Sequence, residues 1–150
     1  GEGQALWVLG SFFDIKAGAH ETGGSLAVVE MTYLPGKPGA PPHRHNCGEA
    51  TYVLEGPIRY HIEDQVVDAE PGDFLFFPEG TLEWMENPTS RPARALVIYD
   101  RTEIIDFFNE IGEAATSRTL PTPAAKEPDL ATVAAVASRH GLEIVPPTSR

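Results

Sequence analysis

The sequence predicts an all-β fold within a single domain. Three features predict it: seven short runs rich in Val, Ile, Tyr and Phe, turn residues between these runs, and helical periodicity only near the C-terminus. Fourteen glycines and fourteen prolines in 150 residues are too many for a helical bundle, and they are typical of short strands joined by tight turns. With 41% hydrophobic residues, a chain of this length can bury one compact core.

The predicted strands precede the predicted helices along the chain. Glu63-Asp64 and the run from Glu70 to Asp73 are expected to close hairpins. Residues 35–42 show no strand or helix period, so we expect an extended loop that delivers His43 to the sheet. The predicted strands are residues 5–13, 26–34, 50–54, 58–62, 65–69, 74–77 and 94–99.

After Asp100 the pattern of apolar residues changes to helical spacing. Apolar side chains at 104, 105, 107, 108 and 111 predict a helix that begins after Thr102 and ends at Gly112. Residues 114–127 are polar and rich in Pro and Ala, and they predict a linker. A second helix is expected over 129–140, with Asp129 at its start and Gly141 at its end. We expect residues 1–101 to form the β-barrel and residues 102–150 a helical extension packed on it within the same domain.

Charge and cysteine content exclude several classes of function. The formal net charge is -11 and no block of Lys or Arg occurs, which argues against nucleic-acid and membrane-surface partners. No apolar run approaches the roughly 20 residues that span a bilayer. The lone Cys47 excludes an intrachain disulfide framework, so a reducing, cytoplasmic compartment is expected. A small-molecule substrate is therefore the expected partner.

The run from His43 to Glu49 carries the strongest chemical signal. His43 and His45 are separated by one residue, so in an extended strand their side chains point to the same face. Glu49 adds an anionic oxygen nearby if Asn46, Cys47 and Gly48 bend the chain. Imidazole and carboxylate together are donors that suit divalent first-row metals. This pattern predicts a metal site.

Two motifs resemble those of the cupin superfamily, in particular small bacterial quercetinase-like monocupins. The first motif is matched by His43, His45, Glu49 and Gly56. The second is matched by Gly72, Pro78, Gly80 and Asn87, with Glu83 where the family has its third histidine. Residues 22–24, 30–36, 92–99 and 107–112 carry the resemblance further. It implies an antiparallel jelly-roll barrel, a homodimer and one divalent metal ion, which is Fe, Ni, Mn, Cu or Zn.

The departure at Glu83 leaves three interpretations open. Glu83 is a fourth ligand beside His43, His45 and Glu49, which makes the site with a divalent ion neutral and less Lewis acidic. Alternatively, Glu83 is an unligated catalytic acid or base; buried beside Glu49, one of the two carboxyls then has a raised pKa and holds a proton. In the third interpretation Glu83 turns to solvent and the site is degenerate.

Aromatic residues supply candidates for a substrate pocket. Tyr60 and His61 leave opposite faces of one strand, and the family resemblance places the aromatic Tyr60 inward. Phe74, Phe76 and Trp84 are predicted either to line an apolar pocket for an aromatic or polyketide-like substrate or to belong to the core. Cys47 is either a thiolate ligand or, more simply, a small residue that fills a turn.

Three functions are compatible with these residues. The leading hypothesis is a metal-dependent, dioxygenase-like (quercetinase-like) oxidoreductase acting on an enol, phenolic or polyketide-like substrate. The second is a non-redox cyclase, isomerase or dehydratase that uses Glu83 as acid or base. The third is a cupin that binds a small molecule without catalysis.

Overall fold

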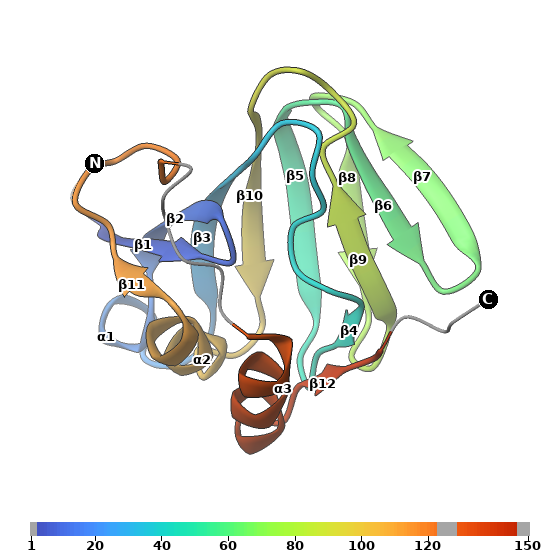
Figure 1. Cartoon of the computed structure of the whole chain (residues 1–150). Coiled ribbons are helices and arrows are strands. Elements are labelled where there is room, and N and C mark those ends of the chain that lie inside the picture. The colour runs from blue at the N-terminus through green and yellow to red at the C-terminus, as the bar shows by residue number, and fades with distance from the viewer. Residues whose placement is uncertain (1–2, 123–128, 147–150) are drawn as a thin grey trace.

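The computed structural model describes residues 3–122 and 129–146, which form a barrel of two antiparallel sheets (Figure 1). This architecture confirms the predicted all-β, jelly-roll fold class. In spatial order, the larger sheet contains β11 (Glu113–Ala114), β1 (Gln4–Val8), β2 (Ser11–Ala17), β3 (Ala27–Tyr33), β10 (Ala93–Tyr99), β5 (Glu49–Glu55) and β8 (Phe74–Phe77). The smaller sheet contains β12 (Glu143–Ile144), β4 (His43–Arg44), β9 (Leu82–Glu86), β6 (Ile58–Ile62) and β7 (Gln65–Ala69).

Three predicted strands coincide with β6, β7 and β8, and the hairpin turn at Glu63-Asp64 joins β6 to β7. The prediction of one strand over residues 5–13 is wrong. Two antiparallel strands, β1 and β2, replace it, joined by Leu9 and Gly10 with φ of 49° and 81°. Positive φ at both central residues is the geometry of a tight hairpin turn, which Gly10 permits at low cost. β9 was missed because Glu83 and Glu86 weaken its strand propensity.

The hydrophobic core lies between the two sheets. Side chains of β3, β5 and β10 alternate between buried and partly exposed positions, as expected for strands with one face in the core. Val29, Val53 and Val97 are at most 1% exposed. Burying each such side chain contributes about 1.5–3 kcal/mol to the free energy of folding relative to leaving it exposed. These strands therefore form a stable framework around the interior of the barrel.

Helices gather at one end of the barrel, the lower end in Figure 1. They are α1 (Ala19–Thr22), α2 (Ile104–Ile111) and α3 (Leu130–Arg139). Both predicted helices are confirmed, although Glu103 rather than Thr102 is the N-cap of α2. Asp129 caps α3 by accepting a hydrogen bond of 3.3 Å from the Thr132 amide. Buried residues of α2 and α3 join the same core as the strands.

The prediction of a linker over residues 114–127 is wrong at its first residue, and part of this segment lies outside the described residues. Ala114 belongs to β11, which pairs with β1, and the indole of Trp7 donates a hydrogen bond to the Thr119 carbonyl at 2.8 Å. Residues 123–127 of the predicted linker lie outside the described residues. None of the helices within 3–122 and 129–146 has the length and apolar character that crossing a membrane requires.

Candidate metal centre

Pairing of β4 with β9 places the second motif next to the first. β4 pairs with β9 so that His43 lies directly opposite Glu83, and side chains opposite each other in an antiparallel pair share one face. His45 follows two residues after His43 and points the same way. The Gly80 amide donates a hydrogen bond of 2.9 Å to the His45 carbonyl, and Gly80 has φ of 83°, which a residue with a side chain rarely adopts.

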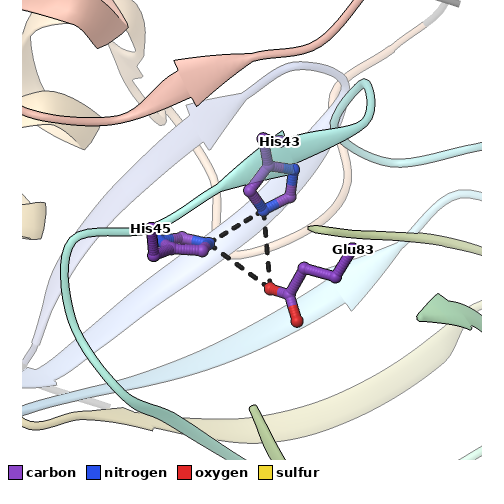
Figure 2. Close-up of side chains that lie close together, drawn as sticks. All are labelled: His43, His45 and Glu83. Carbon is purple, nitrogen blue, oxygen red and sulfur yellow. Dashed lines mark hydrogen bonds and ion pairs between the residues drawn. The ribbon is translucent and has the colours of Figure 1, made fainter. Parts of the chain in front are cut away.

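His43, His45 and Glu83 converge on one point of the barrel interior (Figure 2). The Nε2 atoms of the two histidines are 2.8 Å apart. Glu83 Oε1 lies 3.5 Å from His43 Nε2 and 3.4 Å from His45 Nε2. All three side chains are largely buried, so water competes little for these donor atoms.

The donor atoms are prepared to hold a cation. His43 Nδ1 lies 2.7 Å from the Pro41 carbonyl, which only accepts, so Nδ1 donates this hydrogen bond and Nε2 is the ring nitrogen left for a metal ion. Within the described part of the chain, His45 Nδ1 and Glu83 Oε2 are buried without hydrogen-bond partners. Two imidazole nitrogens and one carboxylate oxygen fit a divalent first-row metal ion.

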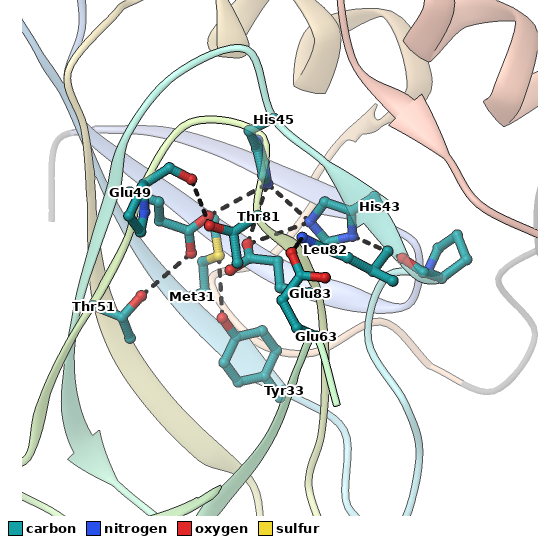
Figure 3. A network of polar contacts seen from close by, with 12 residues as sticks. Met31, Tyr33, His43, His45, Glu49, Thr51, Glu63, Thr81, Leu82 and Glu83 are labelled. Carbon is teal, nitrogen blue, oxygen red and sulfur yellow. Dashed lines mark hydrogen bonds and ion pairs between the residues drawn. The ribbon is translucent and has the colours of Figure 1, made fainter. Parts of the chain in front are cut away.

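Glu49 lies beside this group rather than within it (Figure 3). Its Oε2 atom is 3.3 Å from His45 Nε2, and its Oε1 atom accepts a hydrogen bond of 3.3 Å from the Thr51 hydroxyl. The group whose donor atoms all lie within 4.8 Å of one another comprises His43, His45 and Glu83. The structure thus brings together three of the four predicted ligands and places Glu49 against one of them.

Burial and charge divide the two carboxyls into different roles. Burial and then the charge of Glu83 raise the pKa of Glu49 well above 4.5. Burial also acts to raise the pKa of Glu83, but hydrogen-bonding contacts with His43 and His45 outweigh it and lower that pKa to about 2. Burial lowers the pKa of His45. Glu83 is therefore the anion of the site, and Glu49 holds a proton.

A cavity opens over these residues, with about 80 Å³ available to the centre of a water molecule. Its polar wall contains the three grouped side chains, Glu49 and Tyr60. The apolar wall comes from both sheets, from α2 and from the C-terminal residues, and includes Phe13, Met31, Phe107, Phe108, Leu142 and Ile144. This arrangement suits a small molecule with one polar edge and an apolar body.

The structure places some of the predicted pocket residues at the cavity and others on the surface. Tyr60 lines the cavity and is 4% exposed. Trp84 borders the cavity, but its ring stacks on His61 with centroids 3.6 Å apart, on the face opposite the inward Glu83. The prediction that Phe74 and Phe76 line the pocket is wrong, because these rings are 65% and 60% exposed on β8. The even-numbered positions of this strand face away from the core.

Cys47 fills a buried position and is not part of the donor group. Burial, followed by the charges of Glu49 and Asp100, raises the pKa of its thiol to about 12, so the thiolate that a metal requires is disfavoured. The simpler interpretation of this residue, a small side chain within a turn, agrees with its 2% exposure.

Several cavity residues were not identified from sequence. Tyr33 and Tyr99 lie at inward positions of β3 and β10, and the alternation of apolar residues in these strands was the available signal. Leu142 and Ile144 reach the cavity because β12 pairs with β4, with Ile144 opposite His43. No local pattern predicts a pairing across 101 residues, since it depends on how α3 packs.

Comparison with known proteins identifies the fold family. Residues 29–99 match the family model described as the cupin domain, Cupin_2. No curated protein sequence matches the chain. An oxalate decarboxylase from Bacillus subtilis is 22% identical, with a TM-score of 0.61 over 77% of this chain and 30% of that chain. A sugar phosphate isomerase from Silicibacter pomeroyi is 26% identical, with a TM-score of 0.55 over 63% of this chain and 61% of that chain.

A third solved structure matches this chain over a larger share of its own length. KdgF from a Halomonas species is 21% identical, with a TM-score of 0.55 over 64% of this chain and 85% of that chain. The oxalate decarboxylase from Bacillus subtilis has Mn(II) centres, whereas this chain spans less than a third of its length. These likenesses show a shared barrel. The family match places a cupin domain at residues 29–99, and the likeness to these solved structures agrees with a cupin fold for the barrel.

Proposed function

We propose that the protein is a metal-dependent enzyme of dioxygenase-like, quercetinase-like type that acts on a small enol, phenolic or polyketide-like substrate. The observation that carries this proposal is the convergence of His43, His45 and Glu83. Two histidines and one carboxylate with open positions are the ligand set of non-haem iron oxygenases. The ion is Fe, Mn, Ni or Cu for oxygenation, and Zn also fits the donors.

Each residue of the site has a part in this proposal. His43, His45 and Glu83 would hold the ion, which supplies Lewis acidity and, when redox-active, exchange of electrons between substrate and dioxygen. Thr51 orients Glu49, whose carboxyl carries a proton next to His45. The apolar wall excludes water and packs against the substrate body. An enol or phenol suits this cavity because its oxygen reaches the polar wall while its carbon skeleton contacts Phe107 and Phe108.

A second candidate, a non-redox cyclase, isomerase or dehydratase, is favoured by the raised pKa of Glu49. A buried carboxyl with a raised pKa can donate a proton to a substrate oxygen in the same cavity. In this candidate Glu49 takes the acid role, and Glu83, whose pKa lies near 2, remains a base or a ligand. Turnover in the absence of dioxygen distinguishes it from the oxygenase.

The decisive measurement is the metal content of protein purified without an affinity tag or chelator. Wild-type protein is expected to carry close to one equivalent of a first-row metal, because three donors converge in a buried site. His43→Ala and Glu83→Gln should lose most of it, whereas Glu83→His, which restores the family histidine, should keep it. His20→Ala is the matched control, since the His20 side chain is 99% exposed. Metal-free wild-type protein that cannot be loaded would contradict the proposal.

Oxygen uptake by the metal-loaded protein then assigns the reaction. We expect consumption of dioxygen with one member of a panel of flavonols, catechols and small diketones, and its loss in His43→Ala. Conversion of a panel member without oxygen uptake supports the non-redox candidate. Tight binding that survives complete chelation and His43→Ala, with no conversion, supports the non-catalytic binding protein instead.

A further inference from the structure

The hydroxyl of Tyr60 is a polar group without an apparent use in the protein itself. The side chain is 4% exposed and lines the cavity above the metal centre. Within residues 3–122 and 129–146, it is the buried hydroxyl that lacks a hydrogen-bond partner. Buried polar groups are nearly always paired, so an unpaired one in a cavity points to a missing ligand.

Two other buried hydroxyls near the candidate site are already hydrogen-bonded. Tyr33 donates to the Met31 sulfur at 3.2 Å, and Thr51 donates to Glu49 at 3.3 Å (Figure 3). Tyr60 therefore differs from these two residues, although it shares their apolar surroundings. Its ring is fixed by packing against Phe77, with centroids 5.7 Å apart, so the hydroxyl is held in place rather than free to seek a distant partner.

Strand register places Tyr60 within reach of a molecule at the metal centre. β6 pairs with β9 so that Ile62 lies opposite Glu83 and Tyr60 opposite Met85. Tyr60 and Glu83 are thus diagonal neighbours on one face, with Cα atoms about 7–8 Å apart. A ligand of a few heavy atoms spans this separation. Both residues line the same cavity, so a ligand bound there can contact both side chains.

The hydroxyl acts as a donor. Burial, followed by the charges of Tyr33, Glu49 and Glu83, raises the pKa of Tyr60 well above 10, so the phenol keeps its hydrogen throughout the physiological range. The ligand must therefore offer an acceptor.

We propose that Tyr60 is the substrate-orienting residue of the site, and that the substrate carries two oxygens, one directed to the metal centre and a carbonyl, enol or phenol oxygen that accepts a hydrogen bond from Tyr60 Oη. This inference rests on the proposed function, since it assumes that His43, His45 and Glu83 bind one end of the substrate. It narrows the substrate class to small molecules with two neighbouring oxygens on an apolar body.

The first test needs neither metal nor substrate. Tyr60→Phe removes an unpaired buried hydroxyl and leaves the ring, so the metal-free variant should melt at the same temperature as wild type or higher. Tyr52→Phe, at a position 45% exposed on the outer face of β5, is the matched control. A clear fall in melting temperature for Tyr60→Phe alone would mean that the hydroxyl is paired within the free protein, and it would overturn the proposal.

The second test uses catechol as the probe, titrated by calorimetry into zinc-loaded protein, in which no oxidation of the probe occurs. Tyr60→Phe should weaken catechol binding about tenfold or more, and Tyr52→Phe should not change it. Equal affinities in all three proteins would overturn the role of Tyr60 while the metal site stands. Failure of the wild type to bind zinc or any other first-row ion would instead refute the proposed function. In that case the melting temperatures of wild type and Tyr60→Phe would still decide whether Tyr60 Oη is unpaired.

Discussion

At the scale of single residues, Glu83 sets this site apart from the cupin motif that it resembles. A carboxylate in place of the third imidazole changes the donor set from three nitrogens to two nitrogens and one anionic oxygen. Its Oε1 atom lies 3.5 Å from His43 Nε2 and 3.4 Å from His45 Nε2, so the carboxylate faces the same point as the two imidazoles. A carboxylate at this position presents an oxygen donor beside the two imidazoles, and an oxygen donor favours harder ions over softer ones.

Asp14 is a second residue whose charge is tied to the fold. It is 6% exposed on β2 and forms ion pairs with Lys16 and with Arg118, which follows β11. Burial acts to raise the pKa of Asp14, but hydrogen bonds from Arg118 and Lys16 outweigh burial and hold the pKa below 3.8. Such a carboxyl stabilises the fold above its unfolded pKa, and this stability is lost as the pH falls through the folded value.

Asp14→Asn should lower the free energy of unfolding at pH 7 by about 1–3 kcal/mol, because charged hydrogen bonds to a buried group are lost. The difference from wild type should shrink as the pH falls from 3.8 through the lower pKa of the folded state, where the native carboxyl becomes neutral. Urea unfolding at pH 7 and at pH 3 measures both effects. Asp64→Asn, in the exposed turn after β6, is the control. A difference that does not depend on pH would contradict the assignment.

At the scale of elements, the C-terminal strap, residues 142–145, borders the candidate metal centre. β12 pairs with β4, and the Val145 amide donates a hydrogen bond of 2.8 Å to the Pro42 carbonyl. This contact steadies the segment that carries His43, while Leu142 and Ile144 close one wall of the cavity. In Figure 1 the strap follows α3 and runs beside β4 at the lower end of the barrel.

Val145→Pro removes the amide hydrogen and should loosen the strap. We expect a loss of about 0.5–1.5 kcal/mol in stability and faster release of bound metal to a chelator, since the strand behind His43 is less constrained. Stopped-flow absorbance with a chromogenic chelator measures the release rate. Val145→Ala keeps the amide and serves as the control. If both variants release metal at the wild-type rate, the strap does not support the site.

At the scale of the whole molecule, one barrel combines a rigid core with a charged interior. His43 lies on β4 and Glu83 on β9 of the smaller sheet, whereas Glu49 lies on β5 of the larger sheet. Electrostatic interactions among these side chains therefore affect the stability of the whole fold. A divalent ion held at this site would compensate the buried negative charge, and metal binding would then be coupled to folding. The homodimer that the family resemblance implies stays a prediction; the exposed rings of Tyr52, Phe74 and Phe76 are neighbours on β5 and β8.

Removal of the metal should lower the melting temperature. A ligand at about 100 times its dissociation constant stabilises a protein by about 2.7 kcal/mol, which for a domain of this size corresponds to about 5–10 °C. Differential scanning calorimetry with and without a chelator measures the shift in wild type. His43→Ala should melt at one temperature under both conditions. An equal effect of the chelator on both proteins would place the ion elsewhere.

The amino-acid sequence by itself determined the fold class, three strands to the residue, both main helices and the two histidines of the centre. Each of these follows from local rules: side chains alternate in strands, apolar residues recur in helices, and His43 and His45 share a face in any extended segment. The hairpin at Leu9-Gly10 was missed because a single glycine inside an apolar run is weak evidence for a turn.

Only the tertiary structure decided which carboxylate joins the histidines. His43 and Glu83 are 40 residues apart, and they meet because β4 pairs with β9 in one register. That pairing also separates the pKa values of Glu49 and Glu83, since each depends on burial and on neighbours from other strands. The outward rings of Phe74 and Phe76, the strap over the cavity and the unpaired Tyr60 hydroxyl likewise arise from long-range packing, which no local pattern encodes.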